Sequence, residues 1–170
     1  MIDSGDDGEN RFRFLKQYLT LERSELFFAD KVIFVEGDTE RILINAMMQK
    51  TDIANKDIAG YIPLMSQNIS VVEVGAYSHV FDEFISYLGI KALIITDIDS
   101  TKGKIASNGR TYYEACKVSS GEATSNASLK HFFNNIPFEK LKTLKKTEKV
   151  LTKNTEGKWV PDPNGMVRIA

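Results

Sequence analysis

Apolar residues in the first hundred positions alternate between short unbroken runs and longer stretches with helical spacing. Three runs rich in β-branched residues predict buried strands at 31–36, 69–74 and 91–96. Apolar residues spaced three and four apart predict two helices between them, one directly after Gly37 and one over 80–88 that ends at Gly89. The order strand, helix, strand, helix, strand predicts an α/β fold with a mostly parallel, right-handed sheet flanked by helices.

The pattern is less regular after the third strand. Residues 100–127 are rich in Ser, Thr, Gly, Asn and Lys, which indicates a long loop or a small polar excursion. Apolar spacing predicts a helix over 128–135 and a lysine-rich helix over 137–150. Two further runs, 158–160 and 166–169, flank a Pro/Asp/Asn/Gly turn and predict a hairpin.

These patterns divide the chain into three expected parts. Residues 1–30 form an N-terminal arm with one or two helices over 12–28, residues 31–135 form the α/β domain, and residues 136–170 form a lysine-rich C-terminal extension.

Composition says more about the cellular compartment of the protein than about its activity. The 170 residues are 42% hydrophobic and 26% charged, with a net charge of −1, so the overall charge gives no support for a dedicated polyanion binder. The single cysteine, Cys116, excludes an internal disulfide framework and fits a reducing compartment. No apolar stretch approaches the roughly 20 residues needed to span a bilayer. We therefore expect a cytoplasmic chain that does not interact with membranes.

Carboxylates follow the first and third predicted strands. Glu36 and Glu40 come at the end of the first strand and in the first turn of the next helix, where either alone is explained by the favourable helix dipole. Asp97 and Asp99 follow the third strand, and residues i and i+2 of an extended segment point to the same face. Two such carboxylates repel unless a cation lies between them. The aspartate pair therefore indicates function.

The four acids are expected to meet. The first and third strands of such a sheet are neighbours when the second lies outside, and ligands of open α/β sheets bind beyond the carboxyl ends of the strands. A cluster of four carboxylates favours Mg²⁺ or Mn²⁺, which prefer oxygen ligands. Two such ions about 3.5–4 Å apart would support phosphodiester cleavage.

The same residues resemble a known family. The strings that carry the likeness are Val35-Glu36-Gly37-Asp38-Thr39-Glu40 and Thr96-Asp97-Ile98-Asp99, which are similar to the strand-end glutamate and the Asp-x-Asp of a Toprim domain. The longer match resembles the C-terminal Toprim region of the OLD (overcoming lysogenization defect) family of ATP-dependent nucleases. It spans roughly residues 20–135 and is carried by segments 26–40, 72–75, 88–99 and 124–130.

This resemblance implies a divalent-metal-dependent endonuclease that cuts or nicks DNA, in a prokaryotic setting such as phage defence. Glu36, Glu40, Asp97 and Asp99 would be the catalytic metal ligands, and Ser125 would contribute near the second metal. The implied partners are DNA and the ATPase module of such proteins, and a homodimer is an open alternative.

The sequence also departs from this family. It contains no Gly-x-x-x-x-Gly-Lys-Ser/Thr loop, so ATP would act only through a module absent from this chain. Residues 12–30 resemble the tail of that module, and family members carry further catalytic residues beyond the equivalent of position 170. We therefore expect a truncated or excised piece.

Two other functions remain open at this stage. Asp97 with Asp99 and Thr101 also fits the Asp-x-Asp-x-Thr signature of haloacid-dehalogenase-like phosphatases, in which the first aspartate is the nucleophile. That fold needs a later aspartate pair, whereas only Asp162 follows Asp99. The second alternative is a catalytically incomplete Toprim fragment that serves as a DNA-docking or assembly module.

Basic residues near the aspartate pair offer a possible DNA contact. The segment 101–104 contains two lysines, and Arg110 follows shortly after. A second excess of positive charge lies in the lysines of 140–153. Either group would contact a phosphate backbone electrostatically. A solvated loop explains the first group equally well, and a helix with an exposed lysine face is the more frequent explanation of the second.

Overall fold

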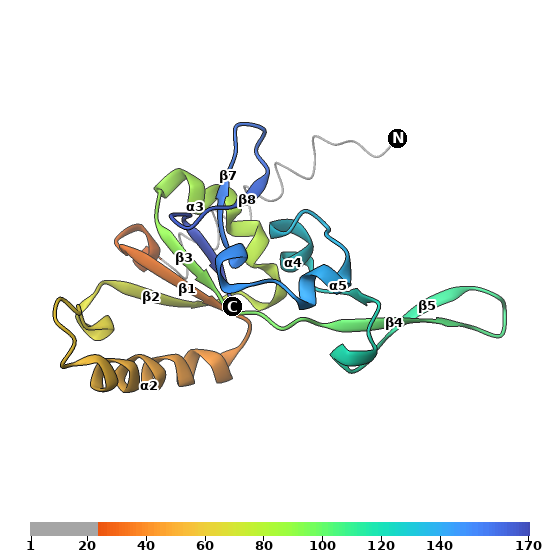
Figure 1. Cartoon of the computed structure of the whole chain (residues 1–170), viewed down its shortest axis with the longest axis horizontal. Helices are drawn as coiled ribbons and strands as arrows, with labels where there is room; N and C mark the ends of the chain where they lie inside the picture. The colour runs from red at the N-terminus through yellow and green to blue at the C-terminus, as the bar shows by residue number, and fades with distance from the viewer. Residues whose placement is uncertain (1–23) are drawn as a thin grey trace. The chain divides into compact units, whose positions relative to one another are not determined.

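The computed structural model describes residues 24–170 (Figure 1). They belong to two compact units, one ending at Ile94 and one spanning Ile95–Ala170. The helices expected over 12–28 lie outside the described residues except for a short 3₁₀ turn, η1 (Ser24–Phe27). Among the described residues, no helix is both long and apolar enough to cross a bilayer.

The first unit is built on a three-stranded parallel sheet. Its strands are β1 (Lys31–Val35), β2 (Ile69–Glu73) and β3 (Lys91–Ile94), in the order β2-β1-β3. The central strand pairs with both neighbours, and Val32–Val35 are buried, as expected of a parallel strand covered on both faces. The predicted parallel α/β arrangement, with the first and third strands as neighbours, is confirmed.

Helices connect these strands. The helix α2 (Asp38–Asn55) packs on β1 and β2, and η3 (Gly75–Phe81) packs on β1 before the chain continues into α3 (Asp82–Leu88). Since β2 and β3 lie on opposite sides of β1, right-handed crossovers place the two connections on opposite faces of the sheet. The helix α3 ends at Gly89, whose φ of 65° is the left-handed conformation expected of a terminal glycine.

The apolar face of α2 is only partly used by the sheet. Ile44 and Met48 are buried, but Ile42, Leu43 and Met47 are 46–69% exposed. The helix continues to Asn55, and its C-terminal half is tied to the next turn.

The short 3₁₀ turn η2 (Leu64–Ser66) is held by Asp52 of α2. The carboxylate accepts hydrogen bonds from Tyr61 Oη at 2.6 Å, Leu64 N at 2.7 Å and Met65 N at 3.0 Å. Desolvation acts to raise the pKa of Asp52, but these hydrogen bonds favour the charged form and lower the pKa below its ordinary value.

The second unit begins with a polar sheet where a loop was expected. Strands β4 (Ser100–Ile105), β5 (Thr111–Ala115) and β6 (Ala123–Thr124) form an antiparallel sheet in the order β5-β4-β6. Of the two alternatives for residues 100–127, the long loop is therefore wrong, and the small polar excursion is confirmed by this sheet. These strands escaped detection because β5 is exposed along its whole length, so no apolar alternation marks it.

The remaining elements are shorter than the sequence pattern predicted. The expected continuous helix over 137–150 is wrong: the segment is α-helical only in α5 (Phe138–Lys142) and 3₁₀-helical in η5 (Lys146–Lys149), and the chain re-enters an extended conformation at Val150. Pairing of Val150–Lys153 with two strands overrides its helical spacing. The elements are η4 (Val118–Ser120), α4 (Ala127–Phe132), α5 (Phe138–Lys142), η5 (Lys146–Lys149), β7 (Val150–Lys153), β8 (Trp159–Pro161) and β9 (Val167–Ile169).

The last three strands form an antiparallel group with β7 in the centre. The predicted hairpin between β8 and β9 is therefore wrong, because both strands pair with β7 instead. The core of this unit joins the group to α4 through Phe132 and Trp159, whose ring centroids are 5.3 Å apart. Leu151 and Val167 are almost fully buried beside them.

Gly165 is expected to be intolerant of substitution. A Cβ atom at this position would lie 2.3 Å from the carbonyl oxygen of Leu151, a backbone atom of the central strand that cannot rotate away. We expect Gly165→Ala to destabilise the protein by about 1–3 kcal/mol, the usual cost of overpacking. Urea unfolding followed by circular dichroism measures this, with Gly103→Ala as a comparison, because a Cβ added there would meet only ordinary contacts at 3.6–3.8 Å. An unchanged midpoint for Gly165→Ala would contradict the close approach.

Candidate functional site

The first acidic loop follows β1 directly. Glu36 is half-buried at the end of the strand, and Gly37 has an extended conformation as the N-cap of α2. The carboxylate of Glu40 turns back and accepts a hydrogen bond from the Gly37 amide at 3.1 Å. A Cβ at position 37 would lie 3.2 Å from the same carboxylate oxygen. Glycine therefore gives the Glu40 side chain room to turn back over the loop.

The third acid of this loop has a different partner. Asp38 lies on the exposed side of the first helical turn, and its carboxylate pairs with Arg41 at 3.3 Å. An exposed pair of this kind contributes little to stability. It nevertheless distinguishes Asp38 from Glu40, whose carboxylate is held against the loop backbone.

The strand order defines the edge at which this loop lies. In β1 and β3, Phe34 is the register partner of Ile94, so these parallel strands end at the same edge of the sheet. The chain leaves β1 toward β2 on one side, whereas β3 lies on the other, which makes this the switch point where open α/β sheets bind ligands. Asp97 follows Ile94 by three residues along the chain.

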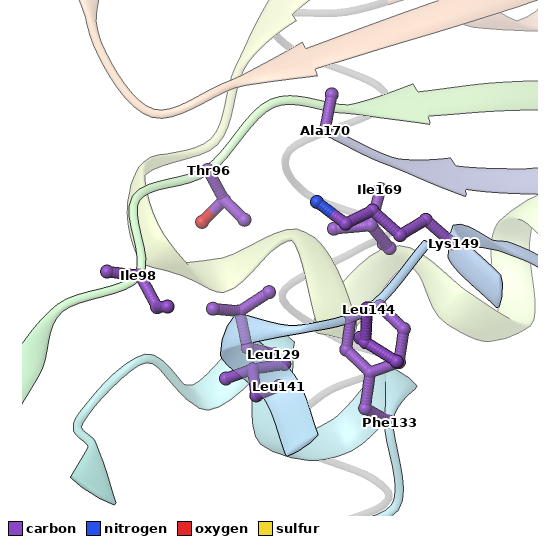
Figure 2. Close-up of a pocket in the computed structure, with 9 residues that line it drawn as sticks. All are labelled: Thr96, Ile98, Leu129, Phe133, Leu141, Leu144, Lys149, Ile169 and Ala170. Carbon is purple, nitrogen blue, oxygen red and sulfur yellow. The ribbon is translucent and has the colours of Figure 1, made fainter. Parts of the chain in front are cut away.

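The second acidic loop, residues 95–99 (the aspartate loop), belongs to the second unit. Its side chains alternate: Thr96 and Ile98 line an apolar pocket of about 90 Å³, whereas Asp97 and Asp99 are exposed. Figure 2 shows Thr96 and Ile98 at one side of this pocket. The other lining residues come from α4, α5, β9 and their flanks: Leu129, Phe133, Leu141, Leu144, Lys149, Ile169 and Ala170. Packing of alternate residues thus anchors the loop while its acids remain accessible.

Residues 124–126 hold this loop through hydrogen bonds to its backbone carbonyls. Thr124 Oγ1 donates to the carbonyl of Ile98 at 2.5 Å. The backbone amide and hydroxyl of Ser125 donate to the carbonyl of Asp99 at 2.9 and 3.2 Å. Asp99 has a φ of 45°, which is uncommon for a residue with a side chain. The expected extended geometry therefore fails at Asp99, where these hydrogen bonds hold the chain in a turn.

Asn126 connects the same loop to a helix. Its side chain is 1% exposed, and its Nδ2 donates to Thr96 Oγ1 at 2.8 Å, to Asp97 O at 3.0 Å and to Asp99 Oδ2 at 3.3 Å. Its Oδ1 accepts from Leu129 N at 3.0 Å as the N-cap of α4. Nothing in the sequence indicated that the amide also holds the aspartate loop.

The role of Ser125 as a metal ligand stays a prediction. Its side chain is exposed, and its hydroxyl donates to the backbone of Asp99. Lys130, which lies in the adjacent helix α4, is likewise exposed.

The donors at both loops suit a hard cation. Glu36, Glu40, Asp97 and Asp99 offer carboxylate oxygens, which Mg²⁺ and Mn²⁺ prefer, and none of the four is fully buried. Across residues 24–170, no three His, Cys, Asp or Glu side chains are gathered in a ready-made metal cluster.

Comparison with known proteins identifies the domain. Residues 27–99 match the TOPRIM domain of overcoming lysogenization defect protein-like proteins. The chain is also 31% identical over 125 residues to endonuclease GajA of Bacillus cereus (strain HuB5-5), an alignment that covers 73% of this chain and 16% of that relative. No solved structure matches the chain. Residues 27–99 therefore form an OLD-like Toprim domain, within a chain that is distantly similar to endonuclease GajA.

Proposed function

We propose that this chain carries the divalent-metal-dependent active site of a DNA endonuclease of the OLD type. The observation that supports this most strongly is the parallel pairing of β1 with β3, because both strands lead into acidic loops from the same edge of one sheet. The likeness to a protein named as an endonuclease points to the same chemistry, and Toprim domains typically bind divalent metals.

In this proposal the two loops supply the metal ligands. Glu36 and Glu40 come from the first, and Asp97 and Asp99 from the second, with Ser125 as a further oxygen donor. Bound divalent ions would polarise a phosphoryl oxygen and lower the pKa of a water nucleophile.

Residues around the ligands would keep them in place. The Gly37 amide orients the carboxylate of Glu40, and the Asn126 amide orients that of Asp99. Such supporting hydrogen bonds typically matter 10- to 100-fold for metal affinity or activity.

The wider context is part of the proposal. The chain spans only 16% of the relative's length, so an ATPase module, a second copy and a role in phage defence would belong to a larger assembly. DNA is the proposed substrate.

Metal titration of the whole chain tests this function. We expect Mn²⁺ at a hundred times its dissociation constant to raise the melting temperature by about 5–10 °C, because binding to the folded state alone stabilises it. Supercoiled plasmid should be nicked in Mn²⁺ or Mg²⁺ and remain intact in EDTA.

The combination of outcomes separates the candidates. If Mn²⁺ causes no thermal shift and the plasmid is not nicked, the proposed function is contradicted. A thermal shift without nicking would instead support the docking or assembly module, whose active site is completed only in a larger protein.

A further inference from the structure

A two-stranded ribbon grows directly out of the aspartate loop. Strand β4 begins at Ser100, the residue after Asp99, and pairs with β5 over five register positions. Only its first two residues, Ser100 and Thr101, also pair with β6. Beyond that root, among the described residues, each strand has only the other as a strand partner, although Gly103 N donates to Glu122 Oε2 at 3.3 Å. Figure 1 shows the two strands running out from the unit that contains α4 and α5. At about 3.3 Å per residue, the six residues of β4 reach about 20 Å.

The ribbon exposes large apolar and aromatic side chains to solvent. Ile105 is 78% exposed, Tyr112 48% and Tyr113 64%. Gly103 is the register partner of Tyr113 and offers no side chain to cover its ring. An isolated hairpin in water is marginally stable at best, and exposed aromatic residues on it contribute little to folding. These side chains are therefore available to a partner.

Charge indicates which kind of partner. Between Ser100 and Lys117 the chain carries four basic residues and one acidic residue, a net charge of +3 against −1 for all 170 residues. Lys102 pairs with Glu122 at 3.8 Å and Lys104 pairs with Glu114, but all four side chains are about half exposed. Exposed pairs are weak, so both lysines can exchange their carboxylates for phosphates at little cost. This surface complements a polyanion.

The opposite faces of the ribbon combine two kinds of contact. Cross-strand partners share a face, so Lys102 and Lys104 lie with Tyr112 on one face, whereas Tyr113 lies with Ile105 on the other. Basic residues beside exposed aromatic rings are typical of surfaces that bind nucleic-acid backbones and stack on bases. Arg110 adds a further charge at the exposed tip, where Ala106 N donates to its carbonyl at 2.9 Å.

We propose that the β4–β5 ribbon is a DNA-binding arm that holds a DNA strand beside the aspartate loop. The inference rests on the proposed function for the cleavage that follows, whereas binding itself needs no metal. Because β4 begins at the residue after Asp99, DNA held along the ribbon would have a phosphate close to Asp97 and Asp99.

Two variants separate the contributions of charge and stacking. Lys104→Ala/Arg110→Ala removes two cations from the ribbon, and Tyr113→Ala removes the exposed ring. A third variant replaces residues 103–113 by Asn-Gly. The register partners Lys102 and Glu114 would then be joined by a two-residue hairpin turn, and the pairing of β4 with β6 would be kept. The matched control is Lys50→Ala/Lys56→Ala, two exposed lysines outside both basic groups of the sequence.

The measurement is fluorescence anisotropy of labelled single-stranded and duplex DNA in EDTA, across a range of salt. We expect the Lys104/Arg110 variant to bind about tenfold more weakly and to lower the slope of log K against log salt by about 1.8, as the loss of two phosphate contacts requires. Tyr113→Ala should weaken single-strand binding about tenfold without changing that slope. The shortened ribbon should lose both contributions, and the control should bind as wild type.

Several results would overturn the proposal. Unchanged affinity of the shortened ribbon, or an equal loss in the Lys50/Lys56 control, would remove the ribbon as the DNA contact. Loss of self-association in sedimentation, with DNA affinity retained, would assign the ribbon to contact between copies of the chain. Plasmid nicking in Mn²⁺ by the wild type, together with unaffected DNA binding in all ribbon variants, would leave the proposed function intact and reject this arm alone. Metal-free DNA binding that depends on the ribbon, without any nicking, would support the arm and reject the nuclease.

Discussion

Replacing Asp97 and Asp99 together by asparagine is expected to lower the rate of Mn²⁺-dependent plasmid nicking at least about a hundredfold. A metal ion contributes several kcal/mol to stabilising the charge of a phosphoryl transition state, and each 1.4 kcal/mol is a factor of ten in rate. Asparagine keeps the shape of each side chain but removes its negative charge. Both side chains are exposed, so the fold should tolerate the change. The Mn²⁺-induced rise in melting temperature should disappear with the activity.

Asp38→Asn is the matched control for this experiment. It removes one carboxylate from the neighbouring loop, but that carboxylate is exposed and pairs with Arg41. We expect nicking and the Mn²⁺-induced thermal shift to remain within about twofold of wild type, since an exposed ion pair contributes little. Equal losses in both variants would indicate a general effect of negative charge and would contradict a specific role for the Asp-x-Asp pair.

Asn126→Ser is expected to weaken Mn²⁺ binding and nicking by about 10- to 100-fold, the usual effect of removing a residue that positions a metal ligand. Serine is as good an N-cap as asparagine, so its oxygen can still accept from Leu129 N at the start of α4. The amide that holds Thr96, Asp97 and Asp99 is lost, however. Since the site is buried, oxygens left without their donor cost about 1–3 kcal/mol. Isothermal titration with Mn²⁺ and thermal unfolding measure the two effects separately.

A second asparagine provides the comparison for Asn126. Asn154 accepts from the amides of Glu156 and Lys158 in the turn between β7 and β8, away from the acidic loops along the chain. Asn154→Ser should cost some stability without changing Mn²⁺ affinity. If Asn126→Ser lowers the melting temperature but leaves Mn²⁺ affinity and nicking unchanged, Asn126 is only a helix cap and its proposed positioning role is wrong.

The elements that sequence patterns predicted well are those whose burial is one-sided or complete. Unbroken apolar runs such as Val32–Val35 can be satisfied only in the interior of a sheet, and all three predicted strands of the first unit are present. Gly89 was equally readable, because a left-handed residue at a helix end favours glycine.

The elements that were missed lack such a signal. The β4–β5 ribbon has no buried face beyond its root, so its polar sequence is also compatible with a loop. The lysine-rich segment 137–150 has helical spacing, but its last residue, Val150, begins β7, which pairs with β8 and β9 just after it along the chain.

Local patterns of burial and short motifs were enough to predict the parallel α/β unit, the acids that follow its strands and the likeness to Toprim nucleases. The way in which the aspartate loop is held is visible only in the folded protein. Asp99 adopts a left-handed turn, and the three contacts of the Asn126 amide join residues about 30 positions apart. Hydrogen bonds between such distant segments depend on folding that no local pattern encodes.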